Sequence, residues 1–133
     1  MGSGQNEATV RRYWNEVWNA GNLAAVEEFY VPDCLHGEAF SVDNFKRNVE
    51  RTRAAFPDFH VSVDDMFSTS DTVVTRVTYT GTHRGYLGEI APTGRNMKIT
   101  GIDIFRIVDD KCVEHWHEAD HLAMMQQLGL TPL

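Results

Sequence analysis

The sequence has 133 residues, enough for one domain with a hydrophobic core and too few for two. Its 12 Lys and Arg residues against 19 Asp and Glu residues give a net charge of -7, which argues against a polyanionic partner such as nucleic acid. Without a membrane-length apolar run or a signal-peptide pattern, we expect a cytoplasmic protein that binds neither nucleic acid nor membranes.

Met1 to Gly4 has the composition of residual vector sequence, so the expected single domain covers residues 5–133. The two cysteines, Cys34 and Cys112, lack the close spacing of a zinc site. We interpret them as small, partly buried residues in a protein from a reducing compartment.

Helical periodicity dominates the first part of the chain. An amphipathic helix is predicted over residues 7–20 and ends at Gly21, because apolar residues recur at three- and four-residue intervals along one face: Val10, Trp14, Val17 and Trp18, with Tyr13 beside them. A second short helix is predicted over residues 23–30, before Pro32.

A third helix is predicted after Ser41, whose side chain can cap the first turn. It places Val42, Phe45 and Val49 on one face and ends before Pro57.

After Pro57 the pattern changes to the alternation of strands. Residues 59–63 and 73–82 alternate apolar and polar side chains around a turn at residues 68–71. Residues 97–108 and 112–117 are predicted to form a hairpin, followed by a short helix over 122–128 that ends at Gly129.

Three helices followed by at least four antiparallel strands predict an α+β fold, a cone-shaped barrel in which the helices pack on a curved sheet. Apolar side chains could simply fill such a cone. The seven Phe, four Tyr and three Trp residues, together with polar residues at strand spacing, favour a ligand cavity instead.

The segment between the last strand and the last helix concentrates ionisable residues. Glu114, His115, His117, Glu118, Asp120 and His121 lie within eight positions, around Trp116. A connection with only a structural role is usually built from turn residues, so this segment is a candidate site.

The order of elements resembles the nuclear-transport-factor-like fold. Within it, the motifs at residues 56–60, 81–85, 92–95, 101–106 and 113–116, followed by Asp120 and residues 126–129, resemble the SnoaL-like polyketide cyclase (ester cyclase) family. That family also contains hydroxylases and isomerases, and the fold hosts binding proteins, so the resemblance is more specific for fold than for reaction.

The resemblance implies an intramolecular aldol ring closure that uses no metal or cofactor, with Asp120 as the general acid and base. A carboxylate at the mouth of an aromatic cavity loses solvation, which makes it a better base. The alternative is that Asp120 only caps the helix at residues 122–128.

Other candidate catalytic residues are Asp103, which alternation places either toward solvent or in a polar cavity, and His115. His115 and His117 share one strand face and Trp116 takes the other, so only one of the two faces can line the pocket. The candidate substrate-binding residues are Trp14, Trp18, His36, His60, Trp116 and His117. Each histidine could instead be structural, and both tryptophans could be core residues.

The pattern His115-x-His117 also allows a metal site, completed by Asp120 or His121. We favour the interpretation without metal, because alternating histidines also occur on solvated strand faces.

Two classes of function therefore stay open: an enzyme acting on a hydrophobic, carbonyl-bearing small molecule, or a non-catalytic module for ligand binding or dimerisation. A homodimer formed through the sheet is expected, since the outer face of residues 73–82 carries Val74, Arg76 and Thr78 rather than uniform charge.

Overall fold

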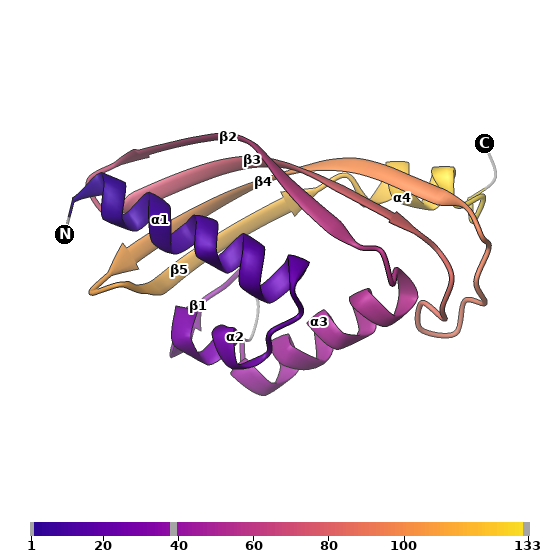
Figure 1. The fold of residues 1–133 in the computed structure, drawn as a ribbon, viewed down its shortest axis with the longest axis horizontal. Coiled ribbons are helices and arrows are strands. Elements are labelled where there is room, and N and C mark those ends of the chain that lie inside the picture. Colours follow the sequence, from indigo (N-terminus) through magenta and orange to yellow (C-terminus); the bar gives the residue numbers. More distant parts are fainter. Residues whose placement is uncertain (1, 38–39, 132–133) are drawn as a thin grey trace.

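The computed structural model describes residues 2–37 and 40–131; Met1, at the start of the predicted vector remnant, lies outside them. In this part of the chain, helical segments pack against a five-stranded sheet of order β1-β5-β4-β3-β2. Figure 1 shows the sheet as a long curved layer with α1, α2 and α3 on one side and α4 at one end. The predicted α+β fold of helices on a curved sheet is confirmed.

The first predicted helix consists of two parts. α1 (Ser3–Tyr13) is α-helical, and the chain then widens into a π-helical segment, Trp14–Asn19. In a π-helix, residues five apart lie above one another. Accordingly, the Trp18 indole Nε1 donates a hydrogen bond to the Tyr13 hydroxyl at 2.9 Å.

The second helix, α2 (Ala24–Phe29), leads directly into β1 (Tyr30–Leu35), a strand that the sequence pattern does not predict. β1 pairs parallel to β5, so the sheet is mixed rather than wholly antiparallel. Pro32 is tolerated because β1 is an edge strand. The third helix, α3 (Val42–Ala55), begins as predicted at Ser41, whose Oγ accepts a hydrogen bond from the Asn44 amide.

The remaining elements are the strands β2 (His60–Thr69), β3 (Thr72–Thr82), β4 (Asn96–Val108) and β5 (Lys111–Ala119), then the short helix α4 (His121–Gln127). β4 alternates strictly between exposed and buried residues. Its odd-numbered residues therefore face the helices, and its even-numbered residues form the outer face of the sheet.

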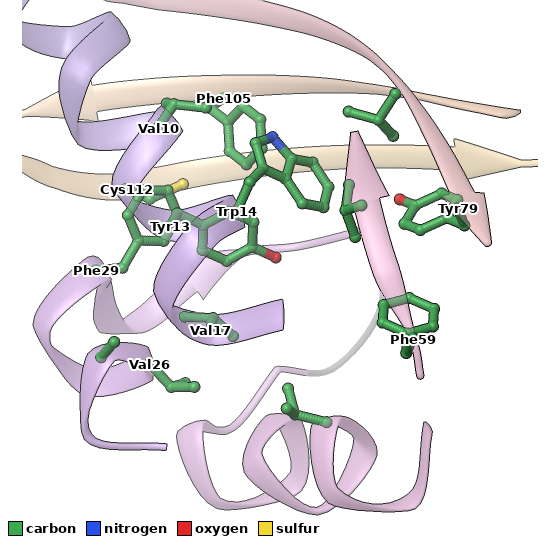
Figure 2. Packing of buried hydrophobic residues seen from close by; sticks show 14 of the residues in the cluster. Val10, Tyr13, Trp14, Val17, Val26, Phe29, Phe59, Tyr79, Phe105 and Cys112 are labelled. Atoms are coloured by element: carbon green, nitrogen blue, oxygen red, sulfur yellow. The ribbon is translucent and has the colours of Figure 1, made fainter. Parts of the chain in front are cut away.

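Aromatic side chains fill the space between the helices and the sheet. Tyr13 stacks on Phe29, with ring centroids 4.3 Å apart, and Trp14 contacts Phe105 of β4 and Tyr79 of β3 edge to face. Figure 2 shows Tyr13 and Trp14 between the helical layer and the strands. Cys34 and Cys112 are free thiols buried on the neighbouring strands β1 and β5.

None of the described helices is long and apolar enough to cross a membrane.

Candidate active site

A cavity of about 320 Å³ lies between the inner face of the sheet and the helices α3 and α4. Aromatic residues form much of its wall: Tyr13, Trp14, Trp18, Phe45, Phe59 and Tyr79. Its ionisable residues come from the sheet, from the end of β1 and from α4: Asp103, His115, His117, His36 and His121. A mostly apolar pocket with a few convergent polar groups is typical of a small-molecule site.

The sheet register brings Asp103 and the two histidines of β5 together. Asp103 of β4 stands directly opposite His117, and Phe105, two residues further along β4, stands opposite His115. Side chains of such neighbouring pairs on one face are within contact distance. Gly101 provides room beside them, because a Cβ atom there would lie 2.8 Å from the Tyr79 ring.

One carboxylate oxygen, Asp103 Oδ2, accepts hydrogen bonds from both histidines. The distances are 2.6 Å to His115 Nε2 and 3.0 Å to His117 Nδ1. Asp103 is 0% exposed and the His115 side chain 2%, whereas the His117 side chain is 33% exposed. His117 is therefore the most accessible member of this group to a molecule in the cavity.

Burial and hydrogen bonding set the charges of the three groups. Burial alone would raise the pKa of Asp103, but the hydrogen bonds from His115 and His117 hold it below its ordinary value. Burial lowers the pKa of His115 to about 4, despite its bond to Asp103. Burial also acts to lower the pKa of His117, but the hydrogen bond to Asp103 and its charge outweigh burial and raise it.

Near pH 7, Asp103 is thus an anion and His115 is a neutral hydrogen-bond donor. His117 gains or loses its proton at a pH above the ordinary pKa of histidine. This arrangement leaves His117 Nε2 available for proton transfer and uses Asp103 to orient the ring.

The comparisons with known proteins identify the family. The family model described as SnoaL-like polyketide cyclase matches residues 8–128, nearly the whole chain. The chain belongs to the SnoaL-like polyketide cyclase family. No curated protein matches the chain significantly.

Solved structures of Streptomyces proteins are similar over almost their full length. IdmH, a proposed polyketide cyclase from Streptomyces antibioticus, is 30% identical with a TM-score of 0.82, over 94% of this chain and 99% of that one. AclR, a proposed hydroxylase from Streptomyces galilaeus, is 27% identical with a TM-score of 0.88, over 99% and 85%. TsrD from Streptomyces laurentii, 23% identical with a TM-score of 0.88 over 98% and 99%, supports the fold alone.

In this SnoaL-like chain, most of the predicted site residues line the cavity: Trp14, Trp18, His36, Asp103, His115 and His117. Two predicted substrate contacts lie elsewhere. His60 is exposed at the start of β2, and Trp116 is 43% exposed on the outer sheet face, where its indole nitrogen donates to Glu114. The two histidines of β5, rather than Trp116, therefore face the pocket.

The structure places Asp120 at the N-cap of α4. Its carboxylate accepts a hydrogen bond from the Ala123 amide at 3.0 Å, and its side chain is exposed outside the cavity lining. This is the geometry of the capping alternative, and the catalytic role that the family resemblance implied for Asp120 stays a prediction.

Sequence reasoning assigns no site role to Tyr13, Tyr30 or Tyr79 of this SnoaL-like chain. Tyr30 is predicted to end a helix, whereas it begins β1 and its hydroxyl lies 2.9 Å from His115 Nδ1. The five-residue spacing of Tyr13 and Trp18 is a usable signal, because it fits a π-helical turn but not an α-helical one.

The metal alternative finds no support in the side-chain arrangement. Among residues 2–37 and 40–131, no group of three or more His, Cys, Asp or Glu side chains is placed to hold a metal ion. His117 Nδ1 is already bonded to the Asp103 carboxylate.

Replacing Asp120 tests its structural role. Asp120→Ala removes the capping oxygen and is expected to lower the free energy of unfolding by about 1 kcal/mol, whereas Asp120→Asn retains a capping oxygen and should be close to wild type. Both variants should keep the wild-type turnover once a substrate is known. A large loss of turnover in Asp120→Asn, with unchanged chemical denaturation, would restore Asp120 as the acid and base.

Proposed function

We propose that this protein is an enzyme in which His117 is the general acid and base and Asp103 positions it, acting on a neutral, polyketide-like molecule that carries ketone groups. The observation that supports the proposal is the buried Asp103 carboxylate bonded to Nδ1 of a partly exposed histidine in an aromatic cavity. A base oriented by a fixed carboxylate recurs in proton-transfer enzymes.

In the proposed reaction, His117 Nε2 removes a proton from a carbon between two carbonyl groups and leaves an enolate. The enolate carbon attacks a second carbonyl of the same molecule, forming the new carbon–carbon bond and an alkoxide. The His117 imidazolium then returns its proton to that alkoxide, so the cyclisation needs no net proton and no cofactor. Isomerisation would use the same two proton transfers without the bond formation.

The composition of the cavity supports a neutral substrate. Among the described lining residues there is no Lys or Arg, so a free carboxylate on the ligand would lose its hydration without gaining a permanent positive charge as partner. The aromatic wall suits flat, conjugated rings. The similarity to IdmH favours a polyketide-like substrate of this kind.

A second candidate is hydroxylation, favoured by the similarity to AclR. It would use the same enolate but consume dioxygen. A third, a non-catalytic binding module, would bind the same molecules without exchanging their protons.

Hydrogen–deuterium exchange tests the proposal and does not require the product to be identified. Neutral polycyclic diketones and triketones are first screened for binding, and a bound compound is then followed by NMR in D₂O. The enzyme should accelerate exchange of the carbon-bound proton between two carbonyls, and excess chelator should leave that rate unchanged. Binding without accelerated exchange would favour the non-catalytic module, and oxygen consumption would favour hydroxylation.

We also propose that the protein is a homodimer formed through the outer face of the sheet. Four apolar residues stand in one register across the strands β2, β3, β4 and β5: Phe67, Val74, Ile104 and Trp116. Phe67 is 60% exposed and Ile104 41%. Two ion pairs flank the row, Arg76 with Asp64 and Arg106 with Glu114. Each side of the row thus carries positive and negative charges, which a two-fold related copy could meet with opposite charges.

Light scattering at micromolar concentration should give twice the mass of one chain. Ile104→Lys, which places a charge in the centre of the apolar row, should yield monomers, whereas Leu122→Lys on exposed α4 should remain dimeric. A monomeric mass for the unaltered protein would disprove the dimer.

A further inference from the structure

A chain of hydrogen bonds runs beneath the sheet to the candidate active site. It begins at Trp18 Nε1, which lies 2.9 Å from the Tyr13 hydroxyl, and that hydroxyl lies 3.1 Å from the Tyr30 hydroxyl. The Tyr30 oxygen is in turn 2.9 Å from His115 Nδ1, and His115 Nε2 is 2.6 Å from Asp103 Oδ2. Helix, edge strand and central strands are thus linked through side chains alone.

Each of the four members before Asp103 brings a single proton to this chain near pH 7. Burial, followed by the charge of Asp103, raises the pKa of Tyr13, and burial raises that of Tyr30, so both hydroxyls stay neutral. His115 is neutral too, since burial lowers its pKa to about 4. Trp18 offers one indole N–H.

The direction of every bond then follows. The short contact between His115 Nε2 and the ionised Asp103 oxygen requires a proton, and His115 must supply it. The unprotonated His115 Nδ1 is therefore an acceptor, and the proton it accepts comes from Tyr30. Because Tyr30 gives its one proton to His115, the proton between the two tyrosine oxygens, 3.1 Å apart, must come from Tyr13. The Tyr13 oxygen in turn accepts from Trp18.

We propose that Tyr30 is a positioning residue of the site: its hydroxyl donates to His115 Nδ1 and so stabilises, together with Asp103, the tautomer that donates Nε2–H to Asp103. The inference extends the proposed function, because the carboxylate stabilised in this way is the group that orients His117. In the other tautomer, the His115 Nε2 lone pair would face Oδ2 at hydrogen-bond distance and repel it.

Among the described side chains around His115, Tyr30 is the one that donates to Nδ1. Phe105 stacks on the imidazole with ring centroids 4.2 Å apart and offers no hydrogen bond. The titratable side chains with rings or carboxylates around His115 are Asp103, His117, Tyr13, Tyr30 and His36. Of these, Tyr30 makes the hydrogen bond to Nδ1.

NMR of ¹⁵N-labelled protein tests the inference without any substrate, because imidazole nitrogen shifts distinguish protonated from unprotonated nitrogens. At pH 7, wild-type His115 should show a protonated Nε2 and an unprotonated Nδ1, assigned through the signals lost in His115→Gln. In Tyr30→Phe the Asp103 carboxylate still holds the proton on Nε2, but Nδ1 loses its donor, so the Nδ1 shift should move downfield, as expected for an unprotonated imidazole nitrogen without a hydrogen bond. An unchanged Nδ1 shift in Tyr30→Phe would overturn the proposal.

Two control variants remove other buried hydroxyls from the same cavity wall. Tyr13→Phe should keep the His115 pattern, because Tyr30 retains its proton, and Tyr79→Phe should keep it because Tyr79 contacts His117 rather than His115. An equal change in either control would contradict the specific role of Tyr30. If Tyr30→Phe does not fold, a wild-type His115 with protonated Nδ1 still overturns the inference. Proton exchange on a substrate tests His117 separately, so either proposal can fail alone.

Discussion

His117→Gln is expected to lower turnover by about 100-fold or more, since glutamine cannot accept or release a proton under these conditions. Its side-chain amide can still donate to Asp103, which His117 Nδ1 now does at 3.0 Å. The substitution should therefore change the free energy of unfolding by no more than about 1 kcal/mol. Binding of the ligand should be nearly unchanged, so the loss falls on kcat rather than on KM.

The pH profile of the wild-type enzyme adds a second measurement. His117 works as a base only when unprotonated, and its bond to Asp103 outweighs burial and raises its pKa above 6.5. The rate of enolate formation should therefore rise with pH through that raised pKa and then level off. The inflection should disappear in His117→Gln.

His60→Gln is the matched control for this experiment. It makes the same chemical change at an exposed histidine at the start of β2, outside the cavity lining, and should keep both the rate and the inflection. His117→Gln turning over as fast as His60→Gln would exclude His117 as the acid and base.

The fold was predictable because the hydrophobic periodicity of each segment agrees with the capping residues and prolines that delimit it. Ser41 and Pro57 delimit α3, and the alternation after Pro57 gives the strands of the sheet. β1 was missed because Tyr30–Leu35 contains a proline and lacks alternation; only its pairing with β5 at the edge makes it a strand. The π-helical segment has no signal beyond the spacing of Tyr13 and Trp18.

The site was predictable only in part, and the sheet explains why. Strand alternation correctly placed His115 and His117 on one face. It could not decide the side of Asp103, because Ile102 and Ile104 make the outer face as apolar as the inner one. Asp120 has the sequence position of a functional residue and of an N-cap alike; the Ala123 hydrogen bond shows the cap, and the Asp120→Asn variant tests the catalytic role.

Asp103→Asn is expected to lower the free energy of unfolding by about 3 kcal/mol near pH 7, although the two side chains have the same shape. The carboxylate oxygen Oδ2 now accepts from both His115 and His117. The asparagine amide in its place carries no negative charge, so it cannot offset the cost of burying a protonated His117. Turnover should fall together with stability, because the ring that transfers the proton is no longer held by an anion.

The two proteins should also differ in how acid affects their stability. In the wild type, burial lowers the pKa of His115 from 6.5 to about 4, so unfolding takes up one proton there as pH falls through this interval. The raised pKa of His117 means that its contribution is complete below 6.5 and is lost only as pH rises through the folded value. His117 therefore adds no slope between pH 6.5 and 4.

Without the Asp103 charge, burial, the largest effect on His117, is opposed by the weaker charge effect of Glu118, so the His117 pKa should fall below 6.5. Unfolding of Asp103→Asn then takes up a second proton in the same interval, which steepens the loss of stability on acidification by up to about 1.4 kcal/mol per pH unit. Urea denaturation of both proteins between pH 6.5 and 4.5 measures the difference, from which the contributions of the other histidines cancel. Parallel curves would mean that Asp103 does not control the protonation of His117, and the proposed acid and base pair would have to be abandoned.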